Sequence, residues 1–131
     1  MSGIKSTLAA FALAFSAALV AATPVAAQTQ APQQVPLIEP AQVRGLMALG
    51  GKITIVDVRR PDETAQGHIA GAILMPLDSL PNTYSSLPKK GKLIVYCRSG
   101  HRSAQAVQFL LDHGYKNAVS MNGGYLAWTQ K

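Results

Sequence analysis

The sequence predicts one α/β domain, in which a small and mostly parallel sheet has helices on both faces. Short apolar runs rich in isoleucine and valine alternate with helix-like stretches along the chain, and this alternation is typical of a parallel sheet. Glycines and prolines mark most of the boundaries between the runs, as expected of turns. The length that follows the N-terminal segment suits one domain, and no internal repeat is visible.

Residues 1–27 are expected to be a secretory signal peptide. Lys5 precedes an unbroken run of small and apolar residues over 8–22, and Pro24 and further small residues lead to Ala27. This order predicts export to the periplasm with cleavage after Ala27, and full secretion stays open. An uncleaved membrane anchor is the weaker alternative, because a spanning helix needs roughly 20 apolar residues.

The domain itself is expected to cover residues 37–131. The preceding segment, 28–36, is polar and punctuated by proline, which is typical of a flexible leader. Residues 37–38 suit a short edge strand. Pro40 suits the first turn of a helix, and apolar residues then recur at helical spacing until Gly50.

Four further strands are expected because short runs of β-branched and apolar residues recur between turns. They cover 53–58, 73–75 (as a buried strand), 92–97 and 118–121. A turn is expected over 59–63, and a connector with some helical character over 78–88.

Two more helices are expected in the second half of the domain. Residues 103–113 form an amphipathic pattern that Gly114 ends, as a helix C-cap does. Gly123 and Gly124 then turn the chain into a terminal helix that contains Trp128, where we expect a core residue rather than a ligand.

The chain has a formal net charge of +6, which falls to +5 when Lys5 is removed with the signal peptide. The basic residues are scattered, so the sequence does not predict nucleic-acid binding. Mild positive charge suits a small anionic substrate that is steered to a local site. We expect a monomer that does not stay inserted in a membrane after cleavage.

Cys97 is the only cysteine of the chain, so an exported protein would keep an unpaired thiol in an oxidising compartment. It ends the strand predicted over 92–97, and ligands of open parallel sheets bind beyond the carboxyl ends of strands. A buried cysteine that packs as a small apolar residue is the alternative. The surrounding residues favour a thiolate nucleophile.

The loop after Cys97 is expected to form an anion-binding nest of backbone N–H groups, because Gly100 permits a left-handed turn into the following helix. These dipoles and two nearby arginines should lower the pKa of the thiol from about 8.5 into the range of roughly 3.5–7.5. The expected substrate-binding residues are Arg98, Ser99, Gly100, His101, Arg102 and Ser103.

This loop resembles that of rhodaneses, the thiosulfate sulfurtransferases, whose active-site loop reads Cys-x-x-Gly-x-Arg followed by Ser. Three other motifs stand in the order of the family, and together they make the resemblance specific over residues 37–131. These motifs are Asp57-Val58-Arg59 with Glu63, Gly67-His68-Ile69-x-Gly71-Ala72, and Gly123-Gly124-x-x-x-Trp128. Two positions depart from the family in the first motif, where Arg60 replaces an acidic residue and Thr64 an aromatic one.

The resemblance implies transfer of sulfane sulfur from a donor such as thiosulfate to cyanide or a thiol, through a persulfide on Cys97. It implies neither a metal nor an organic cofactor. Asp57 and Arg59 are expected to support the site, either by orienting an arginine near it or as a structural ion pair.

Two alternatives to this function stay open. Phosphatases and arsenate reductases of the same fold resemble Cys-x5-Arg, whereas four residues separate Cys97 from Arg102; the tighter loop favours one extra sulfur atom over phosphate. A sulfide-carrying or thiol-redox binding module is the other alternative. His68 is expected to make a structural hydrogen bond and His113 to complement a helix dipole, so three dispersed histidines do not predict a metal site.

Overall fold

The computed structural model describes Gly3 and residues 34–130. The predicted signal peptide, apart from Gly3, and most of the predicted leader therefore lie outside the described residues. None of the helices within 34–130 has the length and apolar character that crossing a membrane requires.

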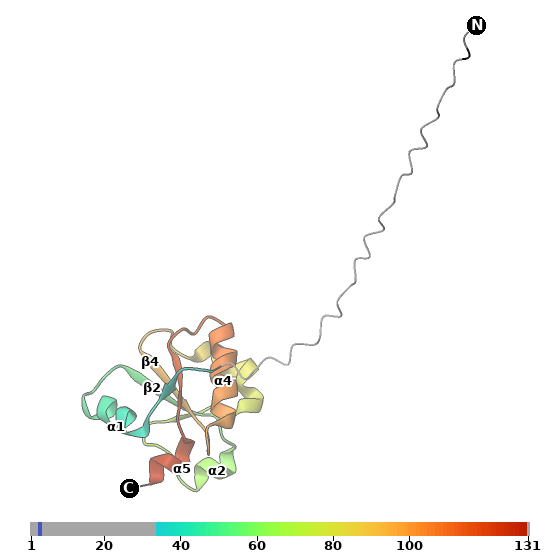
Figure 1. Ribbon diagram of the computed structural model, residues 1–131. Coiled ribbons are helices and arrows are strands. Elements are labelled where there is room, and N and C mark those ends of the chain that lie inside the picture. The colour runs from blue at the N-terminus through green and yellow to red at the C-terminus, as the bar shows by residue number, and fades with distance from the viewer. Residues whose placement is uncertain (1–2, 4–33, 131) are drawn as a thin grey trace. The chain divides into compact units, whose positions relative to one another are not determined.

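Residues 37–129 form the predicted α/β architecture, with five parallel strands in the order β1-β5-β4-β2-β3 (Figure 1). The sequence located every strand correctly, although three of them end one residue earlier than predicted. The strands are β1 (Leu37–Ile38), β2 (Ile53–Asp57), β3 (Ile73–Leu74), β4 (Lys92–Tyr96) and β5 (Ala118–Met121).

Helices cover both faces of this sheet, as predicted. On one face, α4 and the short helices between β3 and β4 enclose a core that includes Val56 and Val95. On the other face, α1 and α5 cover a second core that includes Ile55 and Tyr96. The helices are α1 (Pro40–Ala48), α2 (Pro61–Ala65), η1 (Leu77–Ser79), α3 (Leu80–Thr83), η2 (Tyr84–Ser86), α4 (His101–Asp112) and α5 (Gly124–Thr129).

Two helices begin where the sequence indicated turns. Pro61 opens α2, and the Glu63 side chain accepts a hydrogen bond from the Arg60 backbone N–H at 3.0 Å, which caps the first turn. Helix α4 begins two residues earlier than predicted, because Gly100 adopts φ 110° and serves as its N-cap.

The prediction of a buried strand over 73–75 was wrong for the two residues of β3, although Met75, which follows them, is buried. Ile73 and Leu74 are 45% and 39% exposed. The strand lies at the edge of the sheet, where β2 is its pairing partner on one side. Its apolar residues therefore reflect β propensity at an edge rather than burial.

Helix α5 approaches the carboxyl end of β4 closely and supports the loop that follows. The Tyr125 N–H donates to the Cys97 carbonyl at 2.7 Å, and the Leu126 N–H to the Arg98 carbonyl at 3.0 Å. Gly124 adopts φ 60°, and a Cβ there would lie 2.6 Å from the Cys97 carbonyl oxygen. Glycine is therefore required for this contact.

Candidate active site

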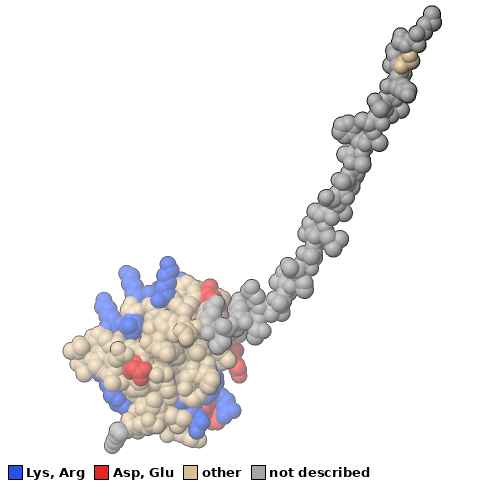
Figure 2. All heavy atoms as spheres, viewed as in Figure 1, with Lys and Arg blue, Asp and Glu red and all other residues tan. Residues whose placement is uncertain are grey.

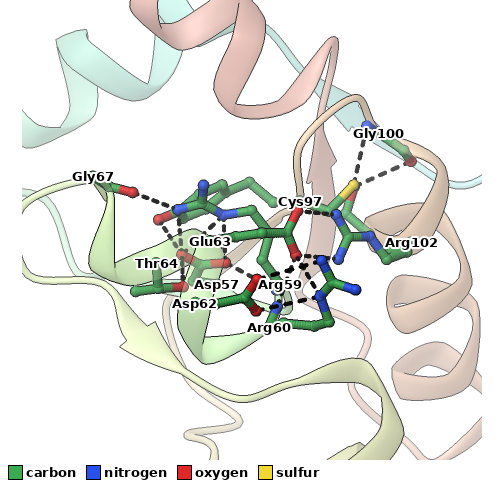
Figure 3. A network of polar contacts seen from close by, with 12 residues as sticks. Asp57, Arg59, Arg60, Asp62, Glu63, Thr64, Gly67, Cys97, Gly100 and Arg102 are labelled. Carbon is green, nitrogen blue, oxygen red and sulfur yellow. Dashed lines mark hydrogen bonds and ion pairs between the residues drawn. The ribbon is translucent and has the colours of Figure 1, made fainter.

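Cys97 directly follows β4, at the end of the sheet where the first turns of α4 and α5 meet. Its side chain is buried, with 1% of the residue exposed. The Gly100 N–H donates to Sγ at 3.1 Å, and Ser103 Oγ lies 3.6 Å from Sγ. Figure 3 shows the sulfur directed toward Gly100. One backbone N–H and one hydroxyl therefore lie within hydrogen-bond distance of the thiol.

These donors determine the ionisation of Cys97. Burial by itself raises the pKa of the thiol, because it disfavours the charged form. Hydrogen bonds from the Ser103 side chain and from the backbone of Ser103, Gly100 and Ser99 outweigh burial and hold the pKa below its usual value. A thiolate of this kind is the nucleophilic form of cysteine.

A second buried hydroxyl extends this group of donors. Ser120 lies on β5 with 1% of its surface exposed, and its Oγ is 2.8 Å from Ser103 Oγ. Ser103 Oγ also lies 3.1 Å from the Gly100 carbonyl, which is a second acceptor for its one proton. The sequence analysis did not identify Ser120. The sequence does contain a signal for it, because Ser120 is the one polar residue in the otherwise apolar run 118–121.

Arg102 forms a bidentate ion pair with Glu63 of α2. Each terminal guanidinium nitrogen lies 2.7 Å from one oxygen of the carboxylate. The Arg102 hydrogen bonds lower the pKa of Glu63 to about 2. The guanidinium expected to bind an anion is therefore shared with a carboxylate. Together with Arg60 and Asp78, the pair lines a cleft of about 360 Å³.

The other predicted loop residues lie toward solvent. Arg98, Ser99 and His101 are exposed. Ser99, Gly100 and His101 line a hollow of about 190 Å³ beside the loop, and Ser120 also lines it. The hollow therefore opens onto the backbone of the loop.

Asp57 and Arg59 form a buried ion pair, with Arg59 Nη2 2.7 Å from Asp57 Oδ2. The same carboxylate accepts hydrogen bonds from the hydroxyls of Tyr96 at 2.8 Å and Thr64 at 2.9 Å, and Arg59 donates to the Gly67 carbonyl. The pair therefore joins β2 and β4 to the α2 region (Figure 3). Thr64, which departs from the family pattern, takes part in this network.

The remaining histidines lie near backbone carbonyls. A ring nitrogen of His68 is 3.3 Å from the Thr64 carbonyl, and one of His113 is 2.7 Å from the Phe109 carbonyl at the end of α4. Within Gly3 and residues 34–130, the His, Cys, Asp and Glu side chains form no group of three that could hold a metal ion.

Comparison with known proteins agrees with this fold. Residues 39–131 match the family model of the rhodanese-like domain. The chain is 40% identical to a sulfurtransferase of Allochromatium vinosum, over 60% of this chain and 73% of that protein. It is 34% identical to the thiosulfate sulfurtransferase GlpE of Stutzerimonas stutzeri, over 70% and 82%.

Longer relatives and a solved structure share the same domain. The chain spans 24% of the probable adenylyltransferase/sulfurtransferase MoeZ of Mycobacterium tuberculosis, at 36% identity. A rhodanese-like domain protein of Staphylococcus aureus superposes with a TM-score of 0.67 at 32% identity, over 73% of this chain and 93% of that one. The fold and the site thus define a single rhodanese-like domain, and the chain belongs to the rhodanese family. Its relatives support sulfurtransferase activity.

Proposed function

We propose that the chain transfers sulfane sulfur from thiosulfate to cyanide or a thiol, with Cys97 as the catalytic residue. The observation that carries this proposal is the placement of the buried Sγ within 3.1 Å of the Gly100 N–H and 3.6 Å of Ser103 Oγ. Donors in these positions stabilise a thiolate before the reaction and the charge of a persulfide after it.

The proposed reaction has two displacement steps. The Cys97 thiolate attacks the outer sulfur of thiosulfate, the S–S bond of thiosulfate breaks, and sulfite leaves with the bonding electron pair. The persulfide that forms on Cys97 carries one negative charge. Cyanide or a thiolate then attacks its outer sulfur, which releases thiocyanate or a new persulfide and restores the Cys97 thiolate. No other reactant is consumed.

The small loop favours sulfur over phosphate. Four residues separate Cys97 from Arg102, and Arg102 is held by Glu63 in a bidentate pair. A phosphate group needs a wider ring of donors than one additional sulfur atom does. These features support sulfur transfer rather than phosphatase or arsenate reductase chemistry.

Turnover of thiosulfate and cyanide to thiocyanate tests this proposal. We expect the wild type to be active and Cys97→Ser to be inactive, because serine supplies no thiolate. Treatment with thiosulfate should add about 32 Da to Cys97, the mass of one sulfur. Equal activity in both proteins would refute the mechanism. A stable adduct without turnover would instead favour a sulfide-carrying module.

A further inference from the structure

All five lysines in the described residues lie at one end of the sheet, where the strands begin. Lys52 directly precedes β2, and Lys92 is the first residue of β4. The Lys92 N–H donates to the Lys52 carbonyl at 3.0 Å. The other three are Lys89, Lys90 and Lys116, in the loops that lead into β4 and β5. We call this surface the lysine end.

The lysine end is poor in counter-charge. Asp112, the last residue of α4, lies at this end, and it accepts a hydrogen bond from Gln108. The other acidic residues among 34–130 lie at or beyond the carboxyl ends of strands, and they are Glu39, Asp57, Asp62, Glu63 and Asp78. In Figure 2, basic side chains project together from the upper left of the domain.

The net positive charge therefore lies away from Cys97. At the end of the sheet that holds Cys97, Arg59, Arg60 and Arg102 are paired with carboxylates. Steering of an anion to the loop thus depends on local donors, and the lysines have no evident part in it. Any role of the lysine end is therefore separate from the active site, and it depends on what this surface contacts.

The chain also reaches the domain at this end. Pro36 directly precedes β1, and its carbonyl accepts a hydrogen bond from the Ser120 N–H at 2.8 Å. Pro36 lines a groove of about 300 Å³ together with Lys92 and Lys116. The described chain therefore enters the domain beside the lysines.

One exposed apolar side chain accompanies the lysines. Leu49 is 85% exposed, the largest value among the exposed large apolar residues. It follows α1, which returns from the carboxyl end of β1 to the start of β2, so Leu49 lies three residues before Lys52 at the same end. Positive charge beside an exposed leucine suits a surface that offers both anionic groups and hydrocarbon.

We propose that the lysine end docks on the anionic phospholipid headgroups of a bilayer, with Leu49 at the acyl boundary and the Cys97 loop facing away from the lipid. Lysine is depleted at the centres of protein interfaces, where aromatic residues and arginine are enriched, which disfavours a protein partner. Lysines near an anionic leaflet each strengthen binding about fivefold. The surface therefore holds the chain at a membrane after cleavage, with no inserted segment and with the Cys97 loop turned outward.

Vesicle sedimentation tests this proposal with the full chain, residues 1–131. We compare vesicles of phosphatidylcholine with vesicles that also contain phosphatidylglycerol, at low and high salt. The wild type should bind the anionic vesicles at low salt and lose most of this binding at high salt. Binding through the N-terminal apolar run should be the same with both kinds of vesicle. The difference in binding between the two kinds therefore measures the contribution of the lysine end.

Two variants, each changed at the same four lysines, distinguish an effect of charge from an effect on structure. Replacing Lys52, Lys90, Lys92 and Lys116 by glutamine should weaken binding to anionic vesicles by on the order of a hundredfold or more. Replacing them by arginine conserves the charge and should retain binding. Thermal unfolding of both variants checks that they are folded, and neither should lose sulfur-transfer activity.

The single variant Leu49→Gln tests the apolar contact. It should weaken binding to anionic vesicles by several fold and leave the salt dependence unchanged, because the lysines remain. Equal binding of the wild type to both kinds of vesicle, or retained binding in the glutamine variant, would overturn the proposal. So would binding to an acidic protein or to heparin in the absence of any vesicle preference.

Discussion

The expected reactivity of Cys97 depends on the few groups that contact its sulfur. Gly100 supplies a backbone N–H at 3.1 Å, and Ser103 supplies a hydroxyl at 3.6 Å. The Ser103 hydroxyl has one proton, and the Gly100 carbonyl is also within reach at 3.1 Å. Ser120 Oγ lies 2.8 Å from Ser103 Oγ. When Ser103 gives its proton to the sulfur, Ser120 is the donor in this contact, which polarises the Ser103 hydroxyl and strengthens its donation.

Ser120→Ala should therefore raise the pKa of Cys97, because Ser103 loses the donor that polarises it. The rate of alkylation by iodoacetamide, measured across pH, reports the thiolate fraction. The midpoint should move to higher pH in Ser120→Ala and return in Ser120→Thr, which restores a hydroxyl. Ser79→Ala removes a hydroxyl far along the chain from the loop and should leave the midpoint unchanged. An unmoved midpoint in Ser120→Ala would exclude this role for Ser120.

At the scale of elements, the Arg102–Glu63 pair ties the first turn of α4 to α2. The pKa of Glu63 is lowered from 4.5 to about 2, so folding favours its ionised form. The stability that follows is present above pH 4.5 and is lost as the pH falls toward 2. Stability falls with falling pH because the Glu63 carboxylate binds a proton more readily in the unfolded chain than in the folded one.

The advantage of the wild type over Glu63→Gln in free energy of unfolding should therefore shrink between pH 4.5 and 2. Urea unfolding at several pH values measures it. Asp62→Asn, on the same helix but with a side chain that is 66% exposed, is the matched control and should change stability little. A constant difference between wild type and Glu63→Gln over this range would contradict the assignment.

The contact between α5 and the Cys97 loop depends on Gly124. In Gly124→Ala the new Cβ would lie 2.5 Å from the Arg98 carbonyl oxygen, at a φ of 60° that alanine disfavours. We expect a loss of at least about 2 kcal/mol in free energy of unfolding, measured by urea denaturation, and faster alkylation of Cys97 as the loop loosens.

Gly45→Ala is the control for this substitution. Gly45 lies within α1, and a Cβ there has no atom within 4 Å. Alanine should stabilise that helix by about 1 kcal/mol. If Gly45→Ala and Gly124→Ala changed the free energy of unfolding by the same amount, the close approach of α5 would not be the reason for glycine at position 124.

The arrangement of elements was largely predictable. Runs of β-branched residues and helical periodicity are local signals, and they identified the strands and the helices on both faces. The burial of β3 was not predictable, because Ile73 and Leu74 have the composition of a core strand and only their edge position exposes them. Helix α2 was missed because Pro61 opens both turns and helices.

At the scale of the molecule, the two ends of the sheet differ in charge. Lysines gather where the strands begin, whereas arginines and carboxylates pair near Cys97. This separation gives the domain one end for chemistry and, in our proposal, one end for lipid. The excess of positive charge therefore lies at the lysine end, whereas near Cys97 the arginines Arg59, Arg60 and Arg102 are paired with carboxylates and Arg98 is exposed.

Export is the prediction that concerns the whole chain. We expect protein recovered from the periplasm to begin at Gln28, because the small residues before it suit cleavage after Ala27. Mass spectrometry of the intact protein measures this. A chain recovered with the membranes and still containing residues 1–27 would contradict cleavage and favour an anchor.

The sequence by itself determined the α/β class, the order of the elements and the placement of a lone cysteine where a strand meets a helix. These features follow from local composition and spacing. Tertiary structure alone decided the partners of that cysteine's loop: Glu63 for Arg102, Ser120 for Ser103, and Gly124 against the Cys97 carbonyl. The parallel sheet brings these distant residues together at the carboxyl ends of its strands, and spacing along a chain does not encode which side chains meet there.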